Sequence, residues 1–182
     1  MPAMKRAFRN HGGLPWWHWR AHADRLKRKA RIVSNAPFVI AGDSTAVVTI
    51  NDFGSAKGIN FASLSIASAG TGEKQAIIHV PAWAGQPAAQ GDTVECRVRV
   101  QVVSGVIAWG GLDIYEQGAS DNMLSNDFEN FIFSGDLSVE HVHSRTFSNP
   151  ACAKTSYALA IAINAPAAVR VNVHFGPLVE VN

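Results

Sequence analysis

The stretch from Asp92 to Val103 constrains the fold of this chain more than any other segment. Five of its apolar residues fall on one parity, and polar or charged residues such as Glu95 and Arg99 lie between them. Successive side chains of a strand point to opposite faces, so this alternation predicts a β-strand with one dry and one solvated face. The apolar residues on the shared parity are Val94, Cys96, Val98, Val100 and Val102.

Two later segments, residues 157–163 and 169–175, alternate in the same way. Half-buried strands of this kind are typical of antiparallel sheets, and many short strands separated by turn residues indicate a sandwich or barrel. We therefore expect an all-β fold, an antiparallel β-sandwich of jelly-roll type. The expected strands span residues 38–40, 46–50, 59–66, 75–80, 94–103, 106–115, 128–133, 137–147, 156–163 and 169–181, with turns that include 52–54, 70–72, 110–111 and 164–166.

The size and composition of the chain fit one folded domain with an appendage. The 182 residues are enough for a sizeable core, and 47% hydrophobic against 16% charged residues excludes a wholly disordered chain. No apolar run approaches the ~20 residues of a transmembrane helix, and the N-terminus lacks the apolar segment of a secretory signal. Cys96 shares the apolar parity of its strand, so we expect a buried thiol there rather than a disulfide with Cys152.

Positive charge is concentrated at the N-terminus. Residues 1–31 hold nine of the sixteen Lys and Arg residues and a single acidic residue, Asp24, for a net charge of +8. The rest of the chain holds seven basic and thirteen acidic residues, for a net charge of −6. Such an asymmetry indicates an interaction surface rather than a requirement of folding.

The same N-terminal segment has the period of a short amphipathic helix. From Pro15 to Arg31 the apolar residues recur every three or four positions, and proline is favoured in the first turn of a helix. Since a turn-forming Ser-Asn-Ala-Pro sequence follows at residues 34–37, we expect a basic Trp-rich arm over residues 1–33 and a sandwich over residues 34–182. The apolar stripe of the arm consists of Trp16, Trp19, Ala23, Leu26 and Ala30.

The arm admits four interpretations. Its Trp stripe and basic residues would dock on a partner protein, because Trp and Arg dominate interface hot spots. A basic helix with Trp also suits an anionic membrane surface, and basic arms neutralise nucleic-acid phosphates. In the fourth interpretation, the helix packs on its own sandwich. We expect partner docking first, through Trp16, Trp17, Trp19, Arg20, Arg25, Leu26, Lys27, Arg28, Lys29 and Arg31.

No motif in the sequence indicates catalysis or a metal centre. His141 and His143 have the spacing of two metal ligands on one face of a strand. Further ligands could only be guessed, from His174 or Glu140, so we expect a solvent-facing or bulged strand there instead of a metal site. Asp113 and Glu116 are of the residue type used as a pair by glycosidases, although acidic residues near a strand end are usually solvated. A GxSxG motif and a Gly-rich phosphate loop are absent. We therefore expect no enzyme activity, no metal and no cofactor.

The segment that begins at Trp109 carries the residue types that bind sugars. Aromatic faces stack on sugar rings, and Asp, Asn, Glu and Gln side chains bind their hydroxyl groups. Large aromatic residues also serve in core packing, and packing is the alternative interpretation for Trp109 and Tyr115. Trp83 and Asn126 are further residues of these types. The candidate glycan-binding residues are Trp109, Asp113, Tyr115, Glu116 and Asn122.

The order of strands and turns in the second half of the chain resembles a known group of domains. Gly91-Asp92 leads into VECRVRVQV, GGLDIYE follows, and HVHSRTFSNPACAKTSYALAIAI precedes VRVNVHFGPLVEV. Over residues 75–182 this order is similar to the carbohydrate-binding-module-like jelly rolls, with a galactose-binding-like fold, of phage tail and head fibres. The chain departs from their pattern at Val94, where a tyrosine is common. The basic arm lies outside that pattern and resembles the N-terminal attachment arms of many virion proteins.

We therefore expect a non-enzymatic virion structural protein of a phage, of the fibre, spike or decoration type. It would be made in the host cytoplasm and located in the virion, where its arm would anchor it to other virion proteins. The resemblance implies a homo-oligomer, commonly a trimer. One alternative is a carbohydrate-binding module that recognises a host surface glycan. A second alternative is a jelly-roll capsid protein whose basic arm contacts nucleic acid.

Overall fold

The structure is a computed structural model that describes residues 38–56, 59–80, 90–120, 122–133 and 136–181. The predicted arm, residues 1–33, and Trp83 lie outside the described residues. Within those residues the secondary structure is all-β, and every strand pair is antiparallel. The strands are β1 (Val39–Ile40), β2 (Val47–Ala56), β3 (Ile59–Val80), β4 (Thr93–Ser104), β5 (Trp109–Gln117), β6 (Met123–Phe131), β7 (His141–Thr146), β8 (Lys154–Phe175) and β9 (Val179–Val181).

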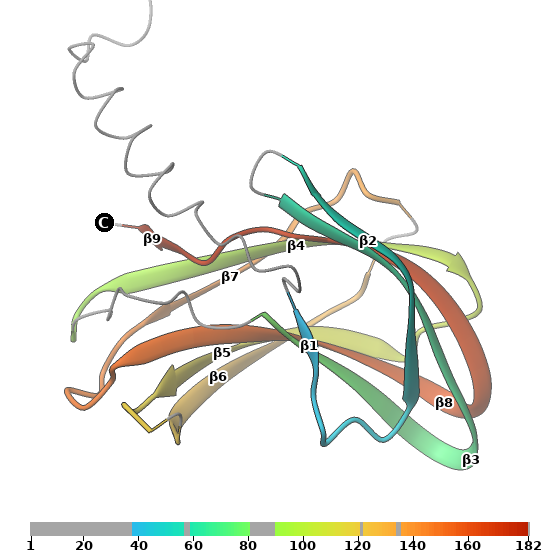
Figure 1. Ribbon diagram of the computed structural model, residues 1–182, viewed down its shortest axis with the longest axis horizontal. Helices are drawn as coiled ribbons and strands as arrows, with labels where there is room; N and C mark the ends of the chain where they lie inside the picture. The colour runs from blue at the N-terminus through green and yellow to red at the C-terminus, as the bar shows by residue number, and fades with distance from the viewer. Residues whose placement is uncertain (1–37, 57–58, 81–89, 121, 134–135, 182) are drawn as a thin grey trace, which may run out of the picture. The chain divides into compact units, whose positions relative to one another are not determined.

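Two long strands, β3 and β8, connect the two layers of the fold. Each has 22 residues, and they pair from Asn60 opposite Phe175 to Val80 opposite Tyr157. Both bend at one level, where the register shifts between Ser68 and Gly72. The hydrogen-bonded ladder therefore continues around the bend, from the upper to the lower layer in Figure 1.

The first layer, called sheet 1, has the order β2, β3, β8, β4, β7, and β9 continues the line of β8 beside β4. The second layer, called sheet 2, has the order β1, β3, β8, β5, β6. Residues 59–68 of β3 and 167–175 of β8 belong to sheet 1. Residues 72–80 of β3 and 154–165 of β8 belong to sheet 2. The predicted all-β antiparallel sandwich is confirmed.

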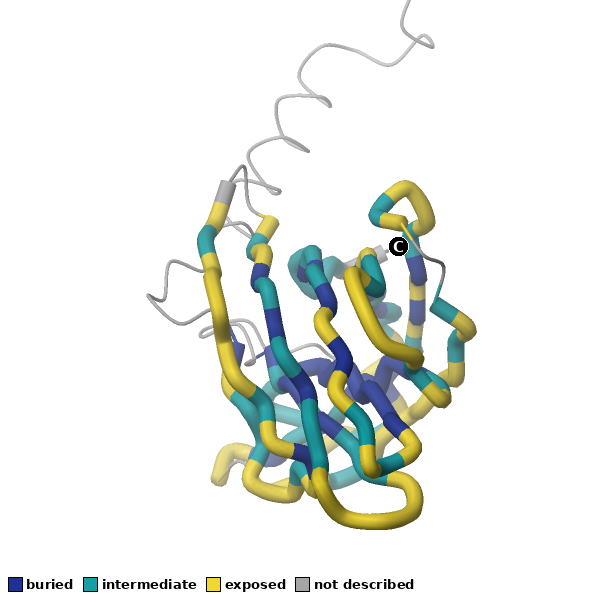
Figure 2. Tube along the Cα trace, turned by 90° about the vertical axis from the view of Figure 1, so that its right-hand side faces the viewer, coloured by how far each residue is buried: buried dark blue, intermediate teal, exposed yellow. Residues whose placement is uncertain are grey.

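The core lies between the inner sides of the two sheets. Sheet 1 contributes apolar side chains such as Leu64 and Val171, and sheet 2 contributes side chains such as Ile78, Leu112 and Leu159, all with no exposed surface. Figure 2 shows buried and exposed residues alternating along the strands. On β4 the predicted dry face is confirmed, because Val94, Cys96, Val98 and Val100 are all at most 4% exposed.

Several predicted turns are wrong. Residues 70–72 and 164–166 lie within β3 and β8, at the bend, and residues 52–54 lie within β2. Gly110 and Gly111 lie inside β5, where they leave room for two rings. A Cβ on Gly110 would overlap the ring of Phe133, and a Cβ on Gly111 would overlap the ring of Phe128. These glycines therefore serve close packing on both sides of one strand.

Candidate functional site

The outer side of sheet 2 gathers most of the chemistry predicted near Trp109. On β5, Leu112 and Ile114 face the core, so the alternate residues Trp109, Asp113 and Tyr115 face outward. Residues in register on the neighbouring strands share this side, and together they form what we call the Trp109 face. It includes Glu73, Gln75, Ile77 and His79 on β3, Ala158, Ala160 and Ala162 on β8, Trp109, Gly111, Asp113 and Tyr115 on β5, and Asn126, Phe128 and Asn130 on β6.

Two side-chain bridges cross β8 on this face. The indole Nε1 of Trp109 donates a hydrogen bond to Glu73 Oε2 at 2.8 Å, which joins β5 to β3. Tyr115 and His79 join the same two strands by ring contact, with centroids 5.1 Å apart. Beneath the bridges β8 presents small side chains: Ser156, opposite Tyr115, is 4% exposed, and Ala158, Ala160 and Ala162 are at most 7% exposed. The small side chains of β8 thus leave space for larger ones to extend over it.

Phe128 adds a second outward ring beside Trp109. The two ring centroids are 5.8 Å apart, with an interplanar angle of 82°. This edge-to-face arrangement is a favourable one for aromatic pairs. Phe128 lies over Gly111, where any larger residue would collide with its ring, and it remains 41% exposed. The pair therefore presents aromatic surface in a fixed orientation.

A buried carboxylate organises the polar part of the face. Asp113 is 8% exposed and accepts hydrogen bonds from Asn126 Nδ2, at 2.9 and 3.2 Å to its two oxygens, and from the Tyr115 hydroxyl. Burial raises the pKa of Asp113 above its ordinary value, and these hydrogen bonds oppose that rise. Burial and the nearby Asp113 charge also raise the pKa of Tyr115, while burial lowers the pKa of His79. Asp113 thereby holds Tyr115 and Asn126 in place.

The structure brings together three of the five candidate glycan-binding residues. Trp109, Asp113 and Tyr115 share the Trp109 face. Asn122 is exposed in the turn after β5, where its carbonyl accepts a hydrogen bond from Gly118 N. From Trp109 to the end of β5 is about 26 Å at the usual rise of a strand, so Asn122 is remote from Trp109. Sequence reasoning missed Glu73, His79 and Phe128, which only strand register brings to this face.

Glu116 lies on the other side of β5, in the core, and is fully buried. Its carboxylate pairs with Arg145 at 3.0 Å and accepts hydrogen bonds from the backbone N–H groups of Ser148 and Asn149 at 3.2 and 3.1 Å. A glycan cannot reach it, and we remove it from the candidate site. Because Asp113 and Glu116 face opposite sides of the strand, they also do not form a carboxylate pair for glycoside hydrolysis.

The two histidines weighed as metal ligands face the interior from β7. His143 Nδ1 lies 2.8 Å from Glu129 Oε2, and its Nε2 lies 2.9 Å from the Asp127 carbonyl oxygen. His141 packs between the rings of Phe131 and Phe133, with centroid distances of 5.1 and 4.9 Å. Across the described residues, no group of three or more His, Cys, Asp or Glu side chains is arranged to hold a metal ion.

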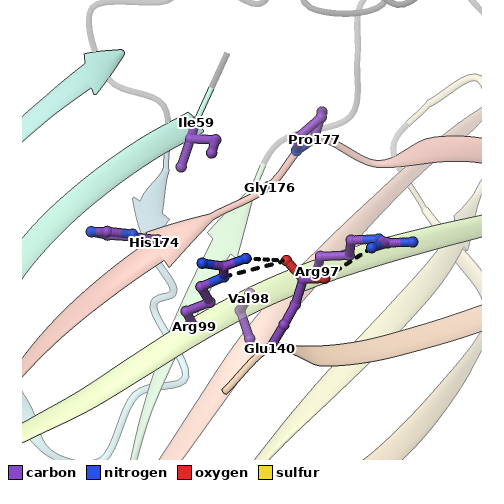
Figure 3. Close-up of a pocket in the computed structure, with 8 residues that line it drawn as sticks. All are labelled: Ile59, Arg97, Val98, Arg99, Glu140, His174, Gly176 and Pro177. Atoms are coloured by element: carbon purple, nitrogen blue, oxygen red, sulfur yellow. Dashed lines mark hydrogen bonds and ion pairs between the residues drawn. The ribbon is translucent and has the colours of Figure 1, made fainter. Parts of the chain in front are cut away.

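A separate pocket of about 180 Å³ opens on the outer side of sheet 1 (Figure 3). Glu140 lies between two arginines of β4: its Oε2 accepts from Arg97 Nη1 at 2.8 Å, and its Oε1 accepts from Arg99 Nη2 at 3.1 Å. The pocket is on the opposite outer side of the sandwich from the Trp109 face. Its lining residues are Ile59, Arg97, Val98, Arg99, Glu140, His174, Gly176 and Pro177.

Comparison with solved structures supports the sandwich fold. A carbohydrate-binding module of the β-sandwich superfamily superposes with a TM-score of 0.52 at 12% identity, over 82% of this chain and 58% of that one. The family 11 carbohydrate-binding module of a Clostridium thermocellum cellulosomal cellulase gives 0.46 at 11% identity, over 80% and 91% of the two chains. The enzymatically active domain of bacteriophage CBA120 tailspike protein 4 gives 0.45 at 12% identity, over 79% and 20%.

The comparisons identify the fold and not a family. No family model and no curated protein matches the sequence. The described part of the chain holds no helix that could cross a membrane. At identities near 12% a structural likeness transfers no site residues, so the function must be argued from the Trp109 face itself. The chain has the antiparallel β-sandwich fold found in carbohydrate-binding modules.

Proposed function

We propose that this chain is a non-catalytic carbohydrate-binding protein and that the Trp109 face contacts the sugar. The observation that carries the proposal is the pair of outward aromatic rings, Trp109 and Phe128, on one sheet face beside hydrogen-bonding side chains held in fixed positions. The apolar faces of sugar rings stack on such aromatic surface. A few well-placed polar groups then set orientation and specificity.

The residues of the face divide into contacts and supports. Trp109 and Phe128 supply the stacking surface, and Asn126 and Asn130 are exposed amides in line on β6. Asp113 is too buried to be a principal contact and instead orients Tyr115 and Asn126. Glu73 fixes the plane of the Trp109 ring through its hydrogen bond to Nε1. Since these supports exist before a ligand arrives, binding would require little reordering of side chains.

A glycan array with the full chain tests this proposal, followed by calorimetric titration of each glycan that binds. Replacing Trp109 by Ala should weaken binding about tenfold or more, because buried aromatic anchors dominate binding energy. Phe128→Ala should weaken it as well. Phe53→Ala is the matched control, because Phe53 is a comparably exposed ring, 52% exposed, on β2 of sheet 1. An array without any bound glycan, or unchanged binding by a folded Trp109→Ala variant, would overturn the proposal.

Attachment of the chain to a virion remains a separate prediction. The arm, residues 1–33, lies outside the described residues, and no described contact bears on a virion partner, a nucleic acid or an oligomer. A glycan-binding sandwich is compatible with display on a particle, because a receptor-binding virion protein would need both parts. The virion location and the role of the Trp stripe therefore stay as stated from the sequence.

A further inference from the structure

The pocket on sheet 1 combines charge, apolar walls and a rigid backbone. Arg97 and Arg99 project from outward positions of β4, and His174 lies directly opposite Arg99 in the register of β4 and β8. Ile59, 45% exposed, and Pro177 supply an apolar side. Figure 3 shows Glu140 between the two guanidinium groups, with Ile59 and Pro177 on one side of them.

Gly176 fixes the backbone at the edge of the pocket. Its N–H donates to the Arg97 carbonyl oxygen at 2.8 Å, and its carbonyl accepts a hydrogen bond from the Tyr157 hydroxyl at 2.6 Å. A Cβ at this position would lie 2.9 Å from the Arg97 carbonyl oxygen, so any larger residue would have to push the strands apart. Because Tyr157 is fully buried, this hydrogen bond anchors the backbone at the edge of the pocket to the core.

The two arginines are not equally neutralised. Arg97 contacts two carboxylates, since its Nε donates to Glu95 Oε1 at 2.6 Å and its Nη1 donates to Glu140. Among the described side chains, Arg99 donates to Glu140 alone, through Nε at 3.3 Å and Nη2 at 3.1 Å. Among the described residues nothing accepts a hydrogen bond from Arg99 Nη1. The charges of Arg97, Arg99, Glu95 and Glu140 balance, so what Arg99 offers is an open guanidinium donor, Nη1, on the strand beside His174.

We propose that this pocket is a second ligand site, which binds the carboxylate of an acidic sugar unit at Arg99. A guanidinium group presents donors in the planar geometry that a carboxylate accepts. The sugar ring would lie against Ile59 and Pro177, with Glu140 accepting a hydroxyl hydrogen. Drug-sized ligands occupy roughly 300–1,000 Å³, so 180 Å³ suits a single ring rather than a chain. This site is independent of the Trp109 face and of its proposed function.

Titration of the full chain with sodium glucuronate, followed by saturation-transfer NMR and calorimetry at low salt, tests the proposal. Glucose, acetate and inorganic phosphate serve as parallel ligands. Glucuronate should bind saturably, and glucose should bind at least tenfold more weakly because it lacks the charge. Glucuronate should also bind more tightly than acetate or phosphate, because only it fills the apolar side. Raised salt should weaken its binding.

Variants assign the binding to the pocket. Arg99→Gln should weaken glucuronate binding at least tenfold, and Arg99→Lys should weaken it several-fold, because lysine keeps the charge but lacks the planar group. Arg170→Gln is the matched control: Arg170 is an exposed arginine on the same side of sheet 1, opposite Ser65. Trp109→Ala should leave this binding unchanged, which separates the pocket from the Trp109 face.

Three results would overturn the proposal. The first is the absence of glucuronate binding by the folded chain. The second is equal binding by the Arg99→Gln variant, or loss of binding in the Trp109→Ala variant, which would place the ligand elsewhere. The third is acetate or phosphate binding as tightly as glucuronate, which would make the pocket a general anion site without recognition of a sugar.

Discussion

Replacing Glu116 by alanine should destabilise the sandwich far more than removal of a surface carboxylate. Glu116 is fully buried, and the side chain of its partner Arg145 is 11% exposed. Arg145 also donates from Nη1 to the Ile114 carbonyl at 3.2 Å and from Nη2 to Ser125 Oγ at 2.6 Å. The ion pair therefore connects the end of β5 with β6, β7 and the loop that follows β7.

The expected loss of stability in Glu116→Ala follows from the charged and polar groups that lose their partner. Without Glu116, Arg145 becomes a nearly buried charge without its carboxylate, and such a loss costs about 3–5 kcal/mol. The N–H groups of Ser148 and Asn149 lose their acceptor as well, at about 1–3 kcal/mol for each one that water does not reach. Because water will enter near the strand end, we expect a fall of about 4 kcal/mol in the free energy of unfolding. For a domain of this size that lowers Tm by about 8–16 °C.

Urea unfolding followed by circular dichroism measures this change. Glu140→Ala is the matched control, because Glu140 also pairs with arginine but its side chain is 30% exposed, and an exposed pair contributes about 0–1 kcal/mol. A double replacement of Glu116 and Arg145 by leucine and methionine should recover much of the loss, because no unpaired charge remains. If Glu116→Ala cost no more than the control, the assignment of Glu116 to a buried structural pair would be refuted.

Three further outcomes follow from the packing. Gly110→Ala should cost about 1–3 kcal/mol in urea unfolding through collision with Phe133, and Phe133→Leu should relieve part of that cost. Burial raises the pKa of Cys96 to about 12, so a disulfide reagent at pH 8 should label the half-buried Cys152 before Cys96 in the folded chain. Burial lowers the pKa of His141, so the unfolded chain binds more protons there and stability should fall from pH 7 to pH 5, less steeply in His141→Phe.

Much of the fold could be predicted from side-chain alternation alone. The boundaries of β4, Thr93–Ser104, differ from the predicted 94–103 by one residue at each end. The bend could not be predicted, because residues 70–72 and 164–166 have the composition of turns between separate strands. Residues 70–72 and 164–166 do interrupt the alternation of inward and outward side chains. They lie beside each other on the paired strands β3 and β8. A single sequence does not show that two breaks will lie side by side, so four expected strands became two long ones.

The candidate site could be predicted only in part. The alternation of side chains along a strand predicts which residues form the core, and it also predicts which candidate site residues share a face. Trp109, Asp113 and Tyr115 lie two and four residues apart and therefore share a face of β5. By the same rule Glu116 lies on the opposite face, and its inclusion was an error that counting along the strand would have found. His79 and Phe128 were beyond reach, because strand register alone places them beside residues 36 and 19 positions away.

The alanines of β8 explain how one strand serves two different outer sides. In sheet 2 the outward residues Ala158, Ala160 and Ala162 are small, so side chains from β3 and β5 meet above them and form the aromatic Trp109 face. In sheet 1, beyond the bend, the outward residues of the same strand include His174, which stands beside Arg99 at the charged pocket. A large residue at Ala162 would separate Trp109 from Glu73. The change from alanine to polar residues along β8 therefore makes the two sides chemically distinct and lets each be tested by its own variant.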